Sequence, residues 1–106
     1  MPTPDEQYEQ AIRQRDSGDK LGAIETLKQA LEIDPRFAIG HGLAAKLYAD
    51  VAMADEAIAH ARRVVELEPN DAFSYTALSV IYQRCGCIPE AEEAKARAFY
   101  MQHGPE

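Results

Sequence analysis

The feature that most limits how this chain can fold is a pattern that returns every 34 residues. The segment AIETLKQALEIDP ends at Pro35, and the similar segment AIAHARRVVELEP ends at Pro69. A chain of 106 residues therefore holds about three copies of one unit. Other residues follow the same spacing: Ala23, Ala57 and Ala91; Gly18, Ala52 and Gly86; Tyr48 and Tyr82.

Each unit has the pattern of two helices joined by a turn. Residues Ala23, Ile24, Leu27, Ala30 and Leu31 fall on one stripe of a helix. A small residue near the middle and a proline near the end mark the breaks. We predict an all-α fold with helices over residues 4–17, 20–34, 38–51, 54–68, 72–85 and 89–102. The units, about 4–37, 38–71 and 72–103, form one domain over 4–103 with short tails at 1–3 and 104–106.

Charge and hydropathy exclude several classes of partner. The chain has 11 Lys and Arg against 18 Asp and Glu, a formal net charge of -7. We therefore expect neither a nucleic acid nor an anionic membrane as the main partner. No apolar run approaches the ~20 residues that span a bilayer, and the first ten residues are polar and acidic, so we expect no signal peptide. We expect a soluble, cytoplasmic protein.

The repeat resembles the tetratricopeptide family. Its first-helix pattern is matched by Tyr75, Leu78, Ser79 and Tyr82, and more loosely by His41, Ala44, Ala45 and Tyr48. Its second-helix pattern is matched by Ala23, Leu27, Ala30 and Pro35, and by Ala57, Ala61, Val64 and Pro69. The resemblance covers about residues 4–103. It implies a right-handed α-α superhelix (solenoid) of three helix-turn-helix units, whose first helices line a concave groove.

The terminal units depart from the pattern toward polarity. Gln7, Gln10 and Gln14 occupy first-helix positions where the third unit has aromatic or aliphatic residues, so we expect that face of the first unit to be wet. Lys95 replaces Leu27 and Ala61 in the last helix. Finite repeat arrays need polar ends. We interpret the chain as a self-contained array, the alternative being a piece of a longer one.

The resemblance implies a partner that binds in the concave groove. Because several of its residues are apolar, we expect a protein or peptide with apolar anchors. Arg15, Lys46 and Arg84 near the rim can pair with acidic groups. The register also places Gly42, Thr76 and Ala77 on this surface. The predicted groove residues are Tyr8, Ile12, Arg15, Ile39, Leu43, Lys46, Phe73, Val80 and Arg84.

One kind of family ligand is not expected. Co-chaperones of this family hold the C-terminal tail of an Hsp70 or Hsp90 chaperone with a clamp of Lys, Asn and Arg. The matching positions here are Tyr8, Ile12, Leu43, Phe73 and Ala77, which offer neither a cation nor an amide. We therefore predict no binding of such a tail by this clamp.

The sequence lacks the common motifs of catalysis and cofactor binding. The sequence contains no phosphate-binding loop, zinc-protease or nucleophile-elbow motif. We predict no enzyme activity, no cofactor and no metal, and we interpret His41, in an aromatic position of the repeat, as a packed ring. Cys85 and Cys87 flank Gly86 in the last turn; we favour a structural role and keep a redox or metal role as the alternative.

The last helix carries three large residues with no following helix to cover them. Phe99, Tyr100 and Met101 either fold back on the fifth helix or form a dimerisation or docking patch. The leading hypothesis is a non-enzymatic scaffold or adaptor that binds a protein segment in the groove. The alternative is a homo-oligomerising assembly subunit that makes its contact through this C-terminal patch.

Overall fold

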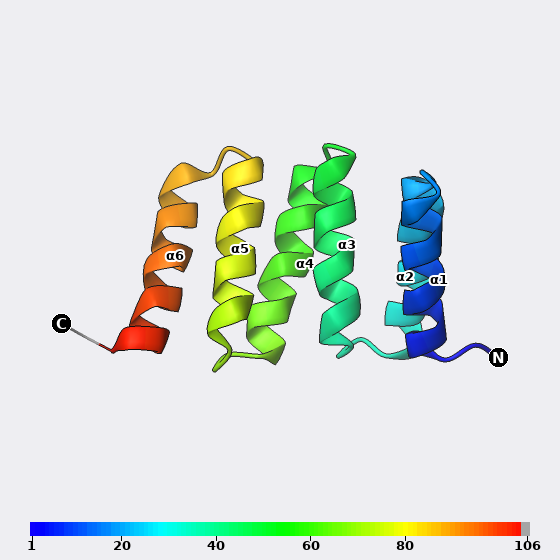
Figure 1. Cartoon of the computed structure of the whole chain (residues 1–106), viewed down its shortest axis with the longest axis horizontal. Helices are drawn as coiled ribbons and strands as arrows, with labels where there is room; N and C mark the ends of the chain where they lie inside the picture. Colours follow the sequence, from blue (N-terminus) through cyan, green and yellow to red (C-terminus); the bar gives the residue numbers. More distant parts are fainter. Residues whose placement is uncertain (105–106) are drawn as a thin grey trace.

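The computed structural model describes residues 1–104, which form six α-helices and no strand. The helices follow one another along the longest axis, with α1 and α2 at one end and α6 at the other (Figure 1). The molecule measures 49 × 25 × 20 Å, the elongated shape of a stack of repeats. The helices are α1 (Pro4–Asp16), α2 (Lys20–Ile33), α3 (Ala38–Asp50), α4 (Ala54–Leu67), α5 (Ala72–Arg84) and α6 (Ile88–His103).

Three of the six helices, α1, α2 and α5, begin where a polar side chain accepts a hydrogen bond from a free backbone N–H group. Thr3 and Glu6 form a capping box at α1, in which Thr3 Oγ1 accepts from the Glu6 N–H and Glu6 Oε1 accepts from the Thr3 N–H. At α2 the Asp19 carboxylate accepts from the Gly22 N–H, and at α5 the Asp71 carboxylate accepts from the Phe73 N–H. Every predicted helix boundary lies within one residue of the observed one.

The turn inside each unit needs a left-handed backbone at one position. Gly18 and Gly86 have φ of 92° and 79°, and Ala52 at the equivalent position has φ of 61°. Glycine adopts this conformation without a steric cost, whereas alanine does not. The three turns therefore share one geometry, and the middle unit forms it with the less suitable residue.

Small residues allow the two helices of each unit to pack closely. Within each unit the helices are in extensive contact, and α2 also packs on α3, α4 on α5 and α3 on α5. One continuous core runs through all three units, with Leu27 and Leu47 fully buried. The molecule is thus a helical solenoid of helix-turn-helix units, as predicted. The small residues at the close approaches are all buried: Ala11, Ala45 and Ser79, and Ala23, Ala57 and Ala91.

The expectation that the glutamines of α1 are wet is wrong for Gln7. Gln7 is only 4% exposed, and Gln14 is half-buried with its Oε1 accepting a 2.7 Å hydrogen bond from the Thr26 hydroxyl of α2. The reason is that α2, the partner helix of the same unit, covers this side of α1. Gln10 is exposed, as expected.

Candidate functional site

A pocket of about 410 Å³ lies between α3 and α5, the first helices of the second and third units. We call it the α3–α5 pocket. Its volume falls in the ~300–1,000 Å³ range of ligand sites. The lining is Gly42, Ala45 and Lys46 of α3, Ala61 and Val64 of α4, and Phe73, Ser74, Thr76, Ala77, Val80, Ile81 and Arg84 of α5.

Small side chains create this pocket and large apolar ones surround its mouth. Gly42 occupies the repeat position that Tyr8 fills in the first unit, and a Cβ added to Gly42 would meet no atom within 4 Å. At the mouth, Phe73 is 74% exposed and Val80 is 49% exposed. An apolar surface of this kind is open to an apolar side chain from another molecule.

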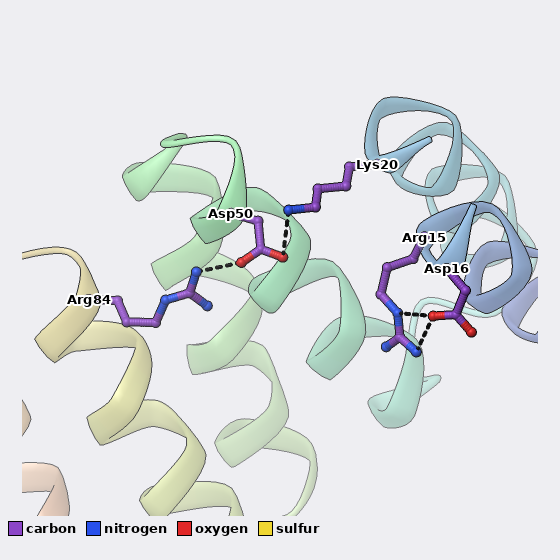
Figure 2. Close-up of polar contacts among 5 residues, drawn as sticks. All are labelled: Arg15, Asp16, Lys20, Asp50 and Arg84. Carbon is purple, nitrogen blue, oxygen red and sulfur yellow. Dashed lines mark hydrogen bonds and ion pairs between the residues drawn. The ribbon is translucent and has the colours of Figure 1, made fainter. Parts of the chain in front are cut away.

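The charged residues of the pocket lining are both basic. Lys46 and Arg84 lie toward the C-terminal ends of their helices, and the other lining residues are uncharged. Arg84 Nη2 bonds to Asp50 Oδ1, and Asp50 Oδ2 lies 3.7 Å from the Lys20 ammonium at the start of α2 (Figure 2). Asp50 therefore links one residue from each of the other two units. The Arg84 hydrogen bond, followed by the positive charge of Lys20, lowers the pKa of the Asp50 carboxyl and keeps it ionised.

Of the nine groove residues predicted from the sequence, the pocket brings together Lys46, Phe73, Val80 and Arg84. Ile39 is 60% exposed on α3 but lies outside the pocket.

The predicted groove residues of α1 have other surroundings. Tyr8 and Ile12 are half-buried against the core, with the Tyr8 ring edge-on to Phe37. Arg15 pairs with its neighbour Asp16 at 3.0 Å, apart from the Asp50 cluster (Figure 2). The structure thus leaves α1 outside the pocket.

Leu43, another predicted groove residue, does not line the α3–α5 pocket. Leu43 is 5% exposed and belongs to the core. Its equivalents Glu9 and Ala77 are exposed, because α1 and α5 stand in the end units whereas α3 has a unit on each side. The middle position in the array buries more of the helix than the repeat pattern indicates.

The sequence did not predict that α4 contributes Ala61 and Val64 to the pocket. Both belong to the second-helix half of the repeat, which the resemblance places away from the groove. The small side chain of Ala61, where the first unit has Leu27, was the available signal.

A second hollow of about 440 Å³ is lined by residues of α4, α5 and α6. Two of its arginines already contact its tyrosines: Arg62 Nε donates to the Tyr82 hydroxyl at 2.8 Å, and the Arg97 guanidinium lies 5.4 Å from the Tyr75 ring centroid. Glu90 and Glu93 also line it, so charges of both signs are present. This mixed lining indicates no ligand class as clearly as the α3–α5 pocket does.

Two histidines form a polar contact inside the second unit. His41 is buried, and its Nε2 lies 2.8 Å from the Pro35 carbonyl oxygen, which can only accept a hydrogen bond. Neutral His41 therefore accepts at Nδ1, where His60 Nδ1 donates across 2.9 Å. The His60 ring also stacks on Tyr48. Burial, and then the nearby His41, lower the pKa of His60, while Glu56 opposes this effect.

The two cysteines stand at the turn before α6, and both are half-buried. Burial, and then the neighbouring Cys87, raise the pKa of the Cys85 thiol, which disfavours the reactive thiolate. Within residues 1–104, no three His, Cys, Asp or Glu side chains gather as a metal site would need. Over the same range, no helix is both long enough and apolar enough to cross a bilayer.

The fold and the pocket define a class of protein, the helical-repeat solenoids that present a surface built from successive first helices. The family model of the tetratricopeptide repeat matches residues 14–37. Two crystal structures of MamA share the fold over 94% of this chain, with TM-scores of 0.84 and 0.85 and 18% sequence identity in both cases. The resemblance to the tetratricopeptide repeat is thus supported by a family-model match over less than half of the chain, and the MamA structures support the shared fold.

This chain spans 58% and 55% of the two MamA chains. No curated protein matches the sequence.

Proposed function

We propose that this protein is a non-enzymatic scaffold that binds a segment of another protein along its first helices, with an apolar side chain seated in the α3–α5 pocket. The observation that carries the proposal is the pocket itself, an open and largely apolar space of about 410 Å³ beside exposed Phe73 and Val80. Apolar anchors that enter such pockets supply much of the binding free energy in peptide recognition.

The test fills the pocket without disturbing the fold. Gly42→Leu places a side chain into the pocket, and the Cβ meets no atom within 4 Å. Replacing a glycine inside a helix by leucine also favours the helix by up to about 1 kcal/mol. Peptides selected from a displayed random library on the full chain should bind Gly42→Leu at least about tenfold more weakly, since about 1.4 kcal/mol of lost apolar contact has that effect.

The matched control is Ala59→Leu, which adds a leucine at an exposed position of α4 outside the pocket lining. Calorimetry on both variants with the same peptides separates pocket filling from a general effect of added apolar surface. Equal affinity for wild type and Gly42→Leu would contradict the proposal.

A second candidate function is self-association through the C-terminal patch of Phe99, Tyr100 and Met101. Phe99 and Tyr100 are 47% and 52% exposed and lie edge to face. Phe99 holds the repeat position of Leu31 and Val65, which are half-buried in their own units. Light scattering after size exclusion should show a dimer that Phe99→Ser/Met101→Ser converts to a monomer. A monomeric wild type would exclude this candidate.

A further inference from the structure

We propose that the segment bound in the α3–α5 pocket carries an acidic side chain two to five positions from its apolar anchor, held by Lys46 and Arg84. The inference rests on the proposed function and names the chemistry of its partner. It follows from the placement of two cations, and no lining anion, at one end of an otherwise uncharged pocket.

The charge around this end of the pocket is not balanced by the protein. Lys46 makes no ion pair with any residue of the described range 1–104, although Asp50 follows it by one helical turn. Both oxygens of Asp50 are engaged, one by Arg84 and the other by Lys20. Arg84 and Lys20 therefore share one carboxylate, and Lys46 has no carboxylate partner within residues 1–104, in a chain whose formal net charge is -7.

Arg84 keeps capacity for a ligand while it holds Asp50. Its bond to Asp50 uses Nη2 alone, whereas a guanidinium has five N–H donors. A partner carboxylate can therefore bind between Arg84 and the free Lys46 ammonium without breaking the contact between the units. Charge-assisted hydrogen bonds of this kind are stronger than neutral ones.

The two helices also fix where the acid lies relative to the anchor. From Val80 to Arg84 the helix rises about 6 Å, and from Phe73 to Arg84 about 16 Å. An extended segment covers these lengths in about two and five residues. Lys46 and Arg84 are both exposed, which suits an acidic side chain that stays partly in water better than an enclosed chain terminus.

The experiment compares peptide selections on two full-length chains, wild type and Lys46→Glu. The library is fused at its C-terminus to the display protein, so that no free terminal carboxylate is present. On wild type we expect enrichment of Asp or Glu two to five positions from an aliphatic or aromatic residue. On Lys46→Glu we expect Lys or Arg at that position, because the charge of the contact has been reversed.

The affinities of the peptides selected on the wild-type chain give a second measurement. Lys46→Glu should weaken them about tenfold, and 1 M salt should weaken binding to wild type because it screens exposed charges. The control is Lys28→Glu, which makes the same change of net charge at an exposed site of α2. Binding to this control should stay within about twofold of wild type.

The outcomes separate this inference from the proposed function. Selected peptides with an apolar consensus but no acidic preference, unaffected by Lys46→Glu and sensitive to Gly42→Leu, would overturn the inference and leave the function standing. Binding only by peptides with a free C-terminus would also overturn it. Selection that yields no peptide, or only peptides insensitive to Gly42→Leu, would instead contradict the proposed function itself.

Discussion

Ala52 holds a backbone conformation that costs an L-amino acid free energy. Its φ of 61° is the only positive value at a non-glycine residue in the described chain, and the equivalent turn positions hold Gly18 and Gly86. The left-handed region costs alanine about 1–2 kcal/mol, and part of this is offset because glycine makes the unfolded chain more flexible. We therefore expect Ala52→Gly to raise the free energy of unfolding by about 0.5–1 kcal/mol.

An alanine-to-glycine substitution inside a helix should instead lower the free energy of unfolding. Ala59 is exposed inside α4, where glycine costs about 0.5–1 kcal/mol relative to alanine. Urea unfolding of wild type, Ala52→Gly and Ala59→Gly, followed by circular dichroism, measures both effects. If Ala52→Gly destabilises the protein as Ala59→Gly does, the strain assigned to Ala52 is not present.

At the scale of helices, the sequence predicted the elements well because several helix boundaries have a local chemical cause. Gly18 and Gly86 end the first helices of their units, Pro35 and Pro69 follow the second, and Asp71 caps α5. These signals depend on residues next to one another in the chain. The 34-residue period then predicted which two helices form each unit. It also predicted that the units stack, since a two-helix unit cannot bury its own apolar stripe.

The candidate site was predicted less completely because it depends on neighbours far away in the chain. Seven of its lining residues were expected from the repeat register: Gly42, Lys46, Phe73, Thr76, Ala77, Val80 and Arg84. The burial of Leu43 depends on units on both sides of α3, and the ion pairs of Asp50 join residues 30 and 34 positions apart. No local pattern carries information on contacts of this kind.

The contact between α3 and α4 through His41 and His60 should make stability depend on pH. The pKa of His60 lies below its ordinary 6.5 in the folded protein, so the unfolded chain binds the proton more readily. Neutral His60 therefore contributes to the stability of the folded protein. This contribution is complete above the pKa of His60 in the unfolded chain, and it is lost as the pH falls from that pKa to the lower pKa of the folded protein. Wild-type stability should therefore fall between about pH 7.5 and pH 5.5.

The variant His60→Gln keeps a donor for His41 Nδ1 but cannot titrate. Since it also loses the stacking on Tyr48, the slopes of stability against pH are compared, not the absolute values. Chemical unfolding at several pH values should give a smaller slope for His60→Gln than for wild type. Identical slopes would show that His60 does not couple to folding.

At the scale of the whole molecule, Asp50 is the one residue within the described range 1–104 that joins all three units through ion pairs. Lys20 of the first unit and Arg84 of the third both contact it, and its side chain is 28% exposed (Figure 2). In a solenoid, stability is the sum of the units and of the interfaces between neighbours. Asp50→Asn keeps the shape and removes the charge, so it should weaken both interfaces at once.

We expect Asp50→Asn to lower the free energy of unfolding by about 1 kcal/mol, because two partly exposed ion pairs contribute up to about that amount. The matched control is Asp16→Asn, at the equivalent position 34 residues earlier, where the partner Arg15 lies in the same helix and the carboxylate is 63% exposed. This control should change stability by less than about 0.5 kcal/mol. The difference between the two variants should shrink in 1 M salt, where charges are screened within about 3 Å. Equal effects of the two substitutions at low salt would mean that the contacts between units add nothing beyond a local surface pair, and the stacking of the units would then depend on apolar packing alone.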